Sequence, residues 1–420
     1  MTAIVKHSSC FIIAALYMLF LSGCDLSETV GVGSAPPVAC FGEDQTSRVG
    51  QYVTLDGSAS TAGEGGIIVG WEWGQDENNP DELFFHHTND DFKREVGFDT
   101  EGLYQFFLTV TNNFGTKSEP GATTITVLPR EKIVFDDANL EVCVRRTLDM
   151  SVEDLTAEIL QSIETLFLHT PRSARIKSFS GLELCVNLED FNGSGQDVVN
   201  LSPITNLTKM RELDLESNEI IDISPLAGMI ELRELWLGGN NIADISALAG
   251  MTKLEYLNLE FTPVTDISAL ASMTELKRVF FSHATFGDIS PVSGLINLDE
   301  FFAFDCNIQN IPELDNLINL RQLRLDNNKI TNISSLSNLT SLIVLELSSN
   351  RITDISVVKY LTKLNSLHLS GNQIEDILPI VENTGIGKFD TVSLKNNPLN
   401  EQSINEYIPA LQNRGVWVSY

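Results

Sequence analysis

The chain has 420 residues, enough for two or three domains with buried cores. Lys and Arg number 27 against 57 Asp and Glu, which gives a formal net charge of −30. This balance argues against a nucleic-acid-binding protein, which needs a basic face to displace counterions, and against electrostatic docking on anionic lipid. It fits the solvated surface of an exported protein.

The N-terminus predicts a signal peptide, residues 1–23. Lys6 and His7 precede an apolar run, residues 11–21, that is too short to span a membrane comfortably. The run leads into Leu-Ser-Gly-Cys, which resembles the lipobox of bacterial lipoproteins. The resemblance implies cleavage before Cys24 and acylation of that cysteine, so that the protein is anchored to a membrane without spanning it. The alternative is a simple signal peptide with an incidental cysteine.

The residues after the signal predict a tether. Residues 24–36 are polar and rich in Gly, Ser and Pro, as flexible linkers are. Export and acylation together imply a lipid-anchored protein of the bacterial cell envelope, on the outer membrane or the cell surface. Asp25 resembles an inner-membrane retention signal of enteric bacteria, which leaves the periplasmic face of the inner membrane as the alternative.

Residues 37–129 predict an all-β sandwich. Short runs that alternate in polarity or are rich in β-branched residues are separated by turns of Gly, Asn and Asp. The predicted strands lie within residues 51–60, 67–73, 103–115 and 122–128.

This segment resembles a PKD-type, immunoglobulin-like domain. The resemblance rests on Val-Thr-Leu-Asp-Gly-Ser-Ala-Ser at 53–60, on Trp-Glu-Trp at 71–73 and on residues 102–115, whereas residues 74–76 depart from the Gly-Asp-Gly turn of many members. It implies structural roles for Asp56 and Trp73, and a spacer or adhesion module.

Residues 130–165 predict a helical cap. Leu140, Cys143 and Leu148 follow helical spacing after Asp136 and Asp137, which form a start signal. A second short helix fits the apolar residues at positions 155, 159 and 163.

Residues 166–400 repeat with a period of 22 residues, and this is the strongest signal in the chain. One apolar position recurs at Phe191, Leu213, Leu235, Leu257, Val279, Phe301, Leu323, Leu345 and Leu367. Slightly longer units at Leu166 and Val392 bring the total to about eleven, and residues 401–420 are expected to form a C-terminal cap.

The repeats resemble leucine-rich repeats of the bacterial internalin-like kind, and residues 134–148 resemble the helical cap of that family. The predicted fold is therefore multidomain: a PKD- or immunoglobulin-like β-sandwich, followed by an α/β leucine-rich-repeat solenoid with a helical N-terminal cap.

The repeat at residues 232–253 shows the expected geometry of a unit. Leu235 and Leu237 must point inward and Trp236 outward, which describes a short strand, and stacked repeats then build a parallel sheet. The Asn that follows the strand is expected to bond the backbone of adjacent coils. This ladder position holds Gln196, Asn218, Asn240, Thr262, Ala284, Cys306, Asn328, Asn350, Asn372 and Asn397.

A column of acidic residues raises a calcium hypothesis. Its members are Asp222, Asp244, Asp266, Asp288, Asp354 and Asp376, with Asn310 and Asn332 interposed. Calcium needs oxygen ligands that converge on one point, whereas a column spreads them out. Bonding of each carboxylate to nearby backbone amides, with Ser as helix cap and Pro as first helical residue, is the favoured interpretation.

Three cysteines fall at apolar positions of the repeat region. Cys143 and Cys185 are either plain core residues or a disulfide that joins the cap to the first repeats. Cys306 occupies the ladder position, which favours a structural role over redox chemistry.

No catalytic motif is found, so the sequence predicts a protein that is not an enzyme and has no cofactor or metal. The best metal candidate is the pair His86 and His87 with Asp90 and Asp91. Adjacent residues on a strand point in opposite directions, which favours a solvated loop instead.

The outward, concave face of the repeats predicts a binding surface. Aromatic residues gather there on four consecutive units, residues 232–306, and exposed apolar patches with aromatic side chains mark recognition sites. The alternative is that Phe281 and Phe304 pack inward and that the rest is surface variation. The candidate ligand-binding residues are Trp236, Tyr256, Asn258, Phe261, Phe280, His283, Phe302, Phe304 and Arg324.

The predicted function is thus that of an exported, non-enzymatic lipoprotein that binds a protein partner through its concave face. Two alternatives are a carbohydrate-binding surface lipoprotein, since aromatic rows also stack on sugars, and an envelope scaffold without a dedicated ligand.

Overall fold

The computed structural model describes residues 35–130, 133–150 and 155–420, which form two compact units that divide at Ile133. The predicted signal peptide, Cys24, Asp25 and most of the predicted tether lie outside the described residues. Across the described ranges, no helix is both long enough and apolar enough to cross a membrane.

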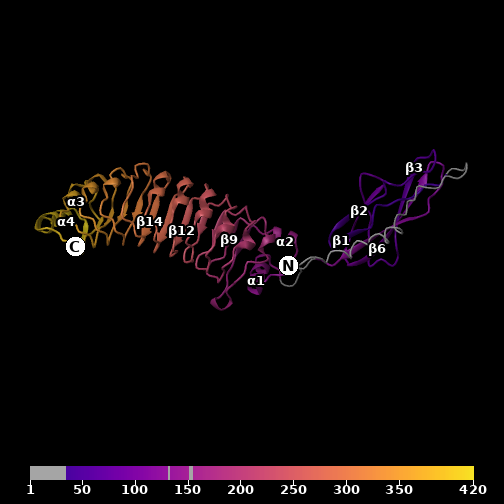
Figure 1. Ribbon diagram of the computed structural model, residues 1–420, viewed down its shortest axis with the longest axis horizontal. Coiled ribbons are helices and arrows are strands. Elements are labelled where there is room, and N and C mark those ends of the chain that lie inside the picture. Colours follow the sequence, from indigo (N-terminus) through magenta and orange to yellow (C-terminus); the bar gives the residue numbers. More distant parts are fainter. Residues whose placement is uncertain (1–34, 131–132, 151–154) are drawn as a thin grey trace, which may run out of the picture. The chain divides into compact units, whose positions relative to one another are not determined.

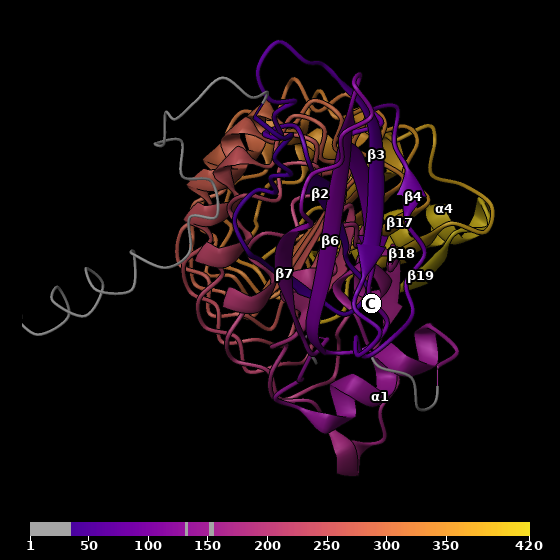
Figure 2. The same cartoon turned by 90° about the vertical axis from the view of Figure 1, so that its right-hand side faces the viewer.

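The first unit is built from two β-sheets. The larger has the strand order β1-β7-β6-β3, with β6 between β7 and β3 (Figure 2), and the smaller has the order β2-β5-β4. Neighbouring strands are antiparallel, except that β1 and β7 are parallel. The strands are β1 (Gln45–Arg48), β2 (Tyr52–Asp56), β3 (Ile68–Gln75), β4 (His86–His87), β5 (Lys93–Gly97), β6 (Gly102–Asn112) and β7 (Gly121–Leu128).

Both sheets contribute to one buried cluster. Val53 and Val96 come from the smaller sheet, and Phe106 and Ile125 come from the larger. The four predicted strands correspond to β2, β3, β6 and β7. The prediction missed β1, β4 and β5, which are short and rich in polar or charged residues. The unit is all-β as expected, and its membership of the PKD-type family stays a prediction.

Asp56 and Trp73 make structural contacts in this unit. The Asp56 carboxylate accepts the backbone N–H of Ser58 at 2.9 Å and lies 3.2 Å from the Lys93 ammonium group. The Trp73 ring meets the edge of Phe41 with 5.6 Å between ring centroids. Hence the aspartate closes a turn and the tryptophan packs, as the sequence suggested.

The second unit is a solenoid whose strands form one parallel sheet of twelve strands in consecutive order, β8 to β19 (Figure 1). Its strands are β8 (Thr165–Phe167), β9 (Asp190–Asn192), β10 (Glu212–Asp214), β11 (Glu234–Trp236), β12 (Tyr256–Glu260), β13 (Arg278–Ser282), β14 (Glu300–Phe304), β15 (Gln322–Arg324), β16 (Val344–Glu346), β17 (Ser366–His368), β18 (Thr391–Ser393) and β19 (Trp417–Ser419). The last strand, inside the predicted C-terminal cap, makes one more than the eleven expected.

Helices lie at both ends of the sheet and short 3-10 turns lie between its strands. The helices are α1 (Ala138–Thr147), α2 (Ala157–Gln161), α3 (Leu378–Glu382) and α4 (Ile408–Asn413), preceded in the last case by a π-helical turn, η10 (Ser403–Tyr407). The 3-10 turns are η1 (Arg172–Ala174), η2 (Leu182–Leu184), η3 (Ser202–Ile204), η4 (Ser224–Leu226), η5 (Ser246–Gly250), η6 (Ser268–Ser272), η7 (Ser290–Gly294), η8 (Ser334–Leu336) and η9 (Ser356–Tyr360).

The 22-residue period sets the register of the sheet. Leu213, Leu235 and Leu257 are paired across β10, β11 and β12, and each is fully buried. Trp236, between two buried leucines, is only half-buried on the opposite face of its strand. The predicted leucine-rich-repeat solenoid with its parallel sheet is therefore confirmed.

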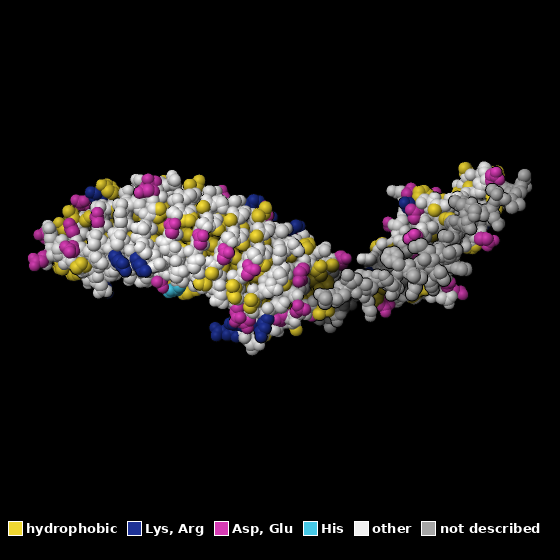
Figure 3. All heavy atoms as spheres, viewed as in Figure 1, with side chains coloured by type: hydrophobic (Ala, Val, Ile, Leu, Met, Phe, Trp, Pro, Cys, Tyr) yellow, Lys and Arg dark blue, Asp and Glu magenta, His cyan; other side chains and the backbone are white. Residues whose placement is uncertain are grey.

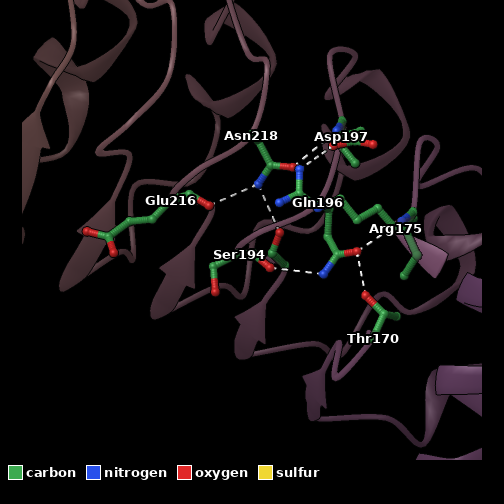
Figure 4. A network of polar contacts seen from close by, with 10 residues as sticks. Thr170, Arg175, Ser194, Gln196, Asp197, Glu216 and Asn218 are labelled. Carbon is green, nitrogen blue, oxygen red and sulfur yellow. Dashed lines mark hydrogen bonds and ion pairs between the residues drawn. The ribbon is translucent and has the colours of Figure 1, made fainter. Parts of the chain in front are cut away.

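The predicted asparagine ladder is also confirmed. The Asn218 side-chain amide donates to the carbonyl oxygens of Gly193 at 2.9 Å and Leu215 at 3.0 Å, and its oxygen accepts the N–H of Val198 at 3.1 Å. Figure 4 shows this residue beside Gln196, which begins the ladder. The same arrangement recurs at Asn240, Asn328, Asn350 and Asn372.

The ladder is interrupted where the sequence departs from Asn. The Thr262 hydroxyl donates only within its own repeat, to the Leu259 carbonyl at 2.6 Å, and Ala284 has no polar side chain. Strands β12, β13 and β14 each have five residues, whereas the neighbouring β11 and β15 have three. In these three strands, backbone pairing thus extends to positions whose carbonyl groups accept a hydrogen bond from an Asn side chain in the other repeats.

The aspartate column bonds the local backbone. The carboxylates of Asp222, Asp244, Asp266, Asp288 and Asp354 each accept the N–H of the Ser two residues later, at 2.8 Å. The prediction of backbone bonding is confirmed. The expected cap was wrong in detail, because the Asp side chain and not the Ser side chain takes the first amide of each 3-10 turn.

The repeat-region cysteines are buried and unpaired. Cys143, Cys185 and Cys306 are all free thiols, so the disulfide alternative for the first two is wrong. Burial raises the pKa of Cys185 and of Cys306 to about 12, which leaves both thiols un-ionised.

Replacement of one ladder residue tests the role of the ladder. Asn350→Ala should lower the free energy of unfolding of the repeat unit by about 2–4 kcal/mol, because it leaves several buried backbone groups without partners. Urea unfolding followed by circular dichroism measures the change. The matched control is Asn241→Ala, an exposed residue beside the ladder, which should stay within about 0.5 kcal/mol of the parent. Equal losses in the two variants would contradict the assignment.

Candidate functional site

Aromatic rings form a continuous row across the exposed face of β11 to β14, called the strand face from here on. Neighbouring ring centroids lie 5.0 Å apart for Trp236 and Tyr256, 5.2 Å for Tyr256 and Phe280, and 4.8 Å for Phe280 and Phe302. All four residues are half-buried, since each covers part of the next. The parallel pairing of the strands brings together residues 66 positions apart, from Trp236 to Phe302.

Arg324 and Glu346 extend this row. The Arg324 guanidinium carbon lies 4.4 Å from the centre of the Phe302 ring, a cation–π contact. Its Nε lies 3.6 Å from a Glu346 carboxylate oxygen on the next strand, and His368 Nδ1 lies 3.9 Å from the same oxygen. The row therefore passes from aromatic to charged side chains without a gap.

A second, shorter row runs beside the first. The rings of Phe261 and His283 are 5.1 Å apart, and those of His283 and Phe304 are 5.3 Å apart. His283 Nδ1 lies 2.7 Å from an Asp305 carboxylate oxygen. Phe261, His283 and Asp305 directly follow the long strands, and Phe304 is the last residue of β14.

Phe261 and His283 adopt a left-handed backbone, with φ of 56° and 55°. The equivalent position holds Ser217, Gly239 and Asn327 in other repeats, all with positive φ. The sharp turn after each strand requires this conformation, which is costly for a bulky side chain such as Phe. A bulky aromatic residue that is exposed and held in this unfavourable backbone conformation indicates a role other than packing.

A hollow of about 450 Å³ lies among these side chains. Its lining includes six of the nine predicted ligand-binding residues: Tyr256, Asn258, Phe280, Phe302, Phe304 and Arg324. Trp236 lies on the strand face and Phe261 and His283 lie in the turns beside it, and none of the three lines the hollow. Phe281 is fully buried, so the inward alternative holds for that residue, whereas Phe304 is half-exposed and lines the hollow.

Three acidic residues of the hollow were missed by the sequence analysis: Glu260, Asp326 and Glu346. The alternation of side chains along a strand could have identified Glu260, because it lies two residues after Asn258 on β12 and therefore on the same face. Outward acidic residues are usually solvated, so the sequence favours the aromatic residues as candidates.

Burial alters the ionisation of this surface. Burial raises the pKa of Glu260 above its usual range, with no other contribution. Burial also raises the pKa of Asp326; the backbone N–H of Ser348 opposes the rise, and the Glu346 charge adds to it. Glu216 is affected in the same way, by burial first and then by the charges of Asp214 and Glu260. These carboxylates are held in surroundings that disfavour their charged form.

The described residues hold no metal cluster. Among residues 35–130, 133–150 and 155–420, no group of three His, Cys, Asp or Glu is placed to hold a metal ion. His86 and His87 form β4 and are both exposed. The side chains that line the hollow offer ring stacking, charge and hydrogen bonding to a ligand.

Comparison with known proteins places the second unit in a family. A family model described as leucine-rich repeats (2 copies) matches residues 230–272 and 340–382. An internalin (inlF) from Listeria monocytogenes is 32% identical over 68% of this chain and 92% of that chain, with a TM-score of 0.58. The repeat unit is thus a leucine-rich-repeat solenoid, and the chain belongs to the internalin-like family of such proteins.

Two further structures are similar. A leucine-rich-repeat protein from Leptospira interrogans is 18% identical over 70% of this chain and 83% of that chain, with a TM-score of 0.55, and it shows the fold alone. An internalin C2 from Listeria monocytogenes is 27% identical over 63% of this chain and 95% of that chain, with a TM-score of 0.42. No curated protein matches the chain.

Glu260→Gln tests the state of the hollow carboxylate. A group whose pKa is raised by folding destabilises the folded protein above that raised pKa, and this cost disappears once the group is protonated in both states, below its ordinary pKa. The variant should therefore melt about 1–2 °C higher than the parent at pH 7, and the gain should vanish at about pH 4. Differential scanning calorimetry at the two pH values measures it. A lower melting temperature at pH 7 would show that the carboxylate is stabilised by its surroundings.

Proposed function

We propose that the chain is a non-enzymatic lipoprotein of the bacterial cell envelope that binds a protein partner through the strand face of its repeat unit. Membership of the internalin-like family supports a binding protein, since leucine-rich-repeat solenoids of this kind commonly mediate protein–protein interaction. The observation that carries the proposal is the unbroken row of rings from Trp236 to Phe302 beside an open hollow.

The physical argument is that this surface has the features of a binding hot spot. Aromatic and arginine side chains are enriched at the energetic centres of protein interfaces, because they bury much area and lose little conformational freedom. Here each ring is held by its neighbours, so the surface is ordered before a partner arrives. A surface that is already ordered loses less entropy on binding.

The remaining parts of the proposal come from the sequence. The lipobox-like Leu-Ser-Gly-Cys supports acylation at Cys24, and the all-β first unit supports a PKD-type spacer between anchor and repeats. Placement on the outer membrane or cell surface follows from export and acylation together, with the inner membrane as the alternative that Asp25 raises.

Removal of the rings should abolish binding and leave the fold intact. The triple variant Trp236→Ala, Phe280→Ala, Phe302→Ala should lose partner capture in an affinity pull-down with the full chain, while the thermal transition of the repeat unit changes little. Phe167→Ala is the matched control, because Phe167 is exposed on β8, in register with Asn192 of the same face and far from the hollow. It should capture the partner as the parent does.

Two outcomes would contradict this assignment. Unfolding of the triple variant would show that the rings are core residues. Capture of glycans on an array, lost in the triple variant and without a captured protein, would favour the carbohydrate-binding alternative instead.

Acylation has its own test. Cys24→Ser should move the protein from the membrane fraction to the soluble fraction of cells and abolish incorporation of labelled palmitate. Cys306→Ser, a substitution at a buried thiol of the repeat unit, is the control and should leave both readouts unchanged. Membrane retention of Cys24→Ser with no palmitate in the parent would refute the lipid anchor.

A further inference from the structure

The hollow contains a carboxylate without a counter-ion. Glu260 is half-buried at the end of β12, and within the described ranges no hydrogen bond or ion pair reaches its carboxylate from another residue. By contrast, Glu346 pairs with Arg324, and Asp326 accepts the N–H of Ser348 at 2.7 Å. A carboxylate that loses water without gaining a partner is unfavourable, so Glu260 marks a place where a cation would be favourable.

The chain shows within the same hollow how a cation can be held there. The guanidinium group of Arg324 lies over the ring of Phe302 and beside the carboxylate of Glu346. Guanidinium is planar and weakly hydrated, so it stacks on rings and donates several hydrogen bonds to a carboxylate at the same time. The ring of Phe302 and the carboxylate of Glu346, 3.6 Å from the Arg324 Nε, thus already form one guanidinium site from the chain's own residues.

A second set of the same groups lines the hollow without an arginine of its own. The rings of Phe280 and Phe304 come from β13 and β14, and Glu260 comes from β12, one strand before Phe280. Among the described residues, Arg278 of β13 forms no hydrogen bond or ion pair with Glu260. Rings and carboxylate are therefore present, and only the cation is missing.

The charge of the surroundings favours the same kind of ligand. Among the described residues that line the hollow, Glu260, Asp326 and Glu346 are acidic and Arg324 is basic, and Glu216 accepts a hydrogen bond there from the Asn258 side chain. Acidic side chains also recur along the repeat unit on the face shown in Figure 3. A cleft lined by one sign of charge attracts and orients a partner of the opposite sign.

We propose that the hollow receives an arginine side chain of the protein partner, with its guanidinium group against the rings of Phe280 and Phe304 and its N–H groups donating to Glu260. This inference rests on the proposed function and adds to it the chemistry of the partner: a protein surface that presents an exposed arginine. The rings provide apolar contact area, and the carboxylate favours a positively charged side chain over a neutral one.

A pair of peptides tests the proposal. One is a dye-labelled peptide with a single arginine between glycines, and the other carries citrulline, which has nearly the same shape and no charge. Titrated with the full chain and followed by fluorescence anisotropy, the arginine peptide should bind at least tenfold more tightly than the citrulline peptide. Equal affinities would overturn the proposal.

Two variants that each remove one negative charge test whether the preference for arginine depends on Glu260. Glu260→Gln should weaken binding of the arginine peptide about tenfold and leave the citrulline peptide unchanged. Glu234→Gln is the matched control, since Glu234 is a half-buried carboxylate on β11 of the same face that does not line the hollow. It should change neither affinity by more than about twofold. Equal losses in both variants would overturn the proposal in favour of a diffuse negative field.

Failure here is distinguishable from failure of the proposed function. If peptides show no preference for arginine while partner capture still depends on Phe280, the arginine inference fails and the binding surface stands. If capture does not depend on Phe280, the binding surface itself fails.

Discussion

The structure of the repeat unit depends on one requirement: the backbone polar groups at the inner end of every coil must find partners away from water. Asn meets this requirement because its amide donates to two carbonyl groups and accepts an amide proton from the preceding coil at the same time. The bonds join residues of successive coils, so they hold each coil at one register relative to the next. The outward residues of successive strands then lie in straight rows across the sheet. Such rows place side chains from different repeats next to one another, so that they can contact one partner together.

The candidate site lies where the Asn ladder is interrupted and a different packing of side chains replaces it. Phe281 occupies the strand position that Leu237 and Leu259 hold in preceding repeats, and Phe286 occupies the position of Ile242. These larger side chains are accompanied by small ones, since Ala303 pairs with Phe281 and Ala284 stands where Asn would be. Interiors are close-packed, so larger rings require smaller neighbours. With the Asn gone, the strands pair directly over five residues, and Glu260 and Phe304 stand at the last positions of β12 and β14. What looks in the sequence like decay of the repeat is therefore a coupled change in packing, backbone pairing and surface.

The features that depend on the 22-residue period could be predicted from the sequence. The period of 22 residues determines which residues pair, so the solenoid, the ladder and the outward direction of Trp236, Phe280 and Phe302 could all be predicted. The sequence was insufficient for properties that arise between repeats. Outward acidic residues are usually solvated, and the burial of Glu260 cannot be read from its own repeat, because most of the side chains that line the hollow come from neighbouring coils. Strand β19 was missed because Trp417–Ser419 follows a helical segment and lies outside the period.

A repeat scaffold of this kind separates stability from specificity. Inward leucines and ladder residues hold the coils together, and the outward residues of the strands contribute little to that packing, so the outward rows can change with small cost in stability. The charge of the hollow then matters more than its area. Rings alone would stack on many partners, including sugars, because every flat apolar surface offers them contact area. A half-buried carboxylate without a counter-ion penalises partners that leave it unpaired and favours those that bring a positive charge. Selectivity at this surface accordingly depends on Glu260, while the rings supply most of the contact area.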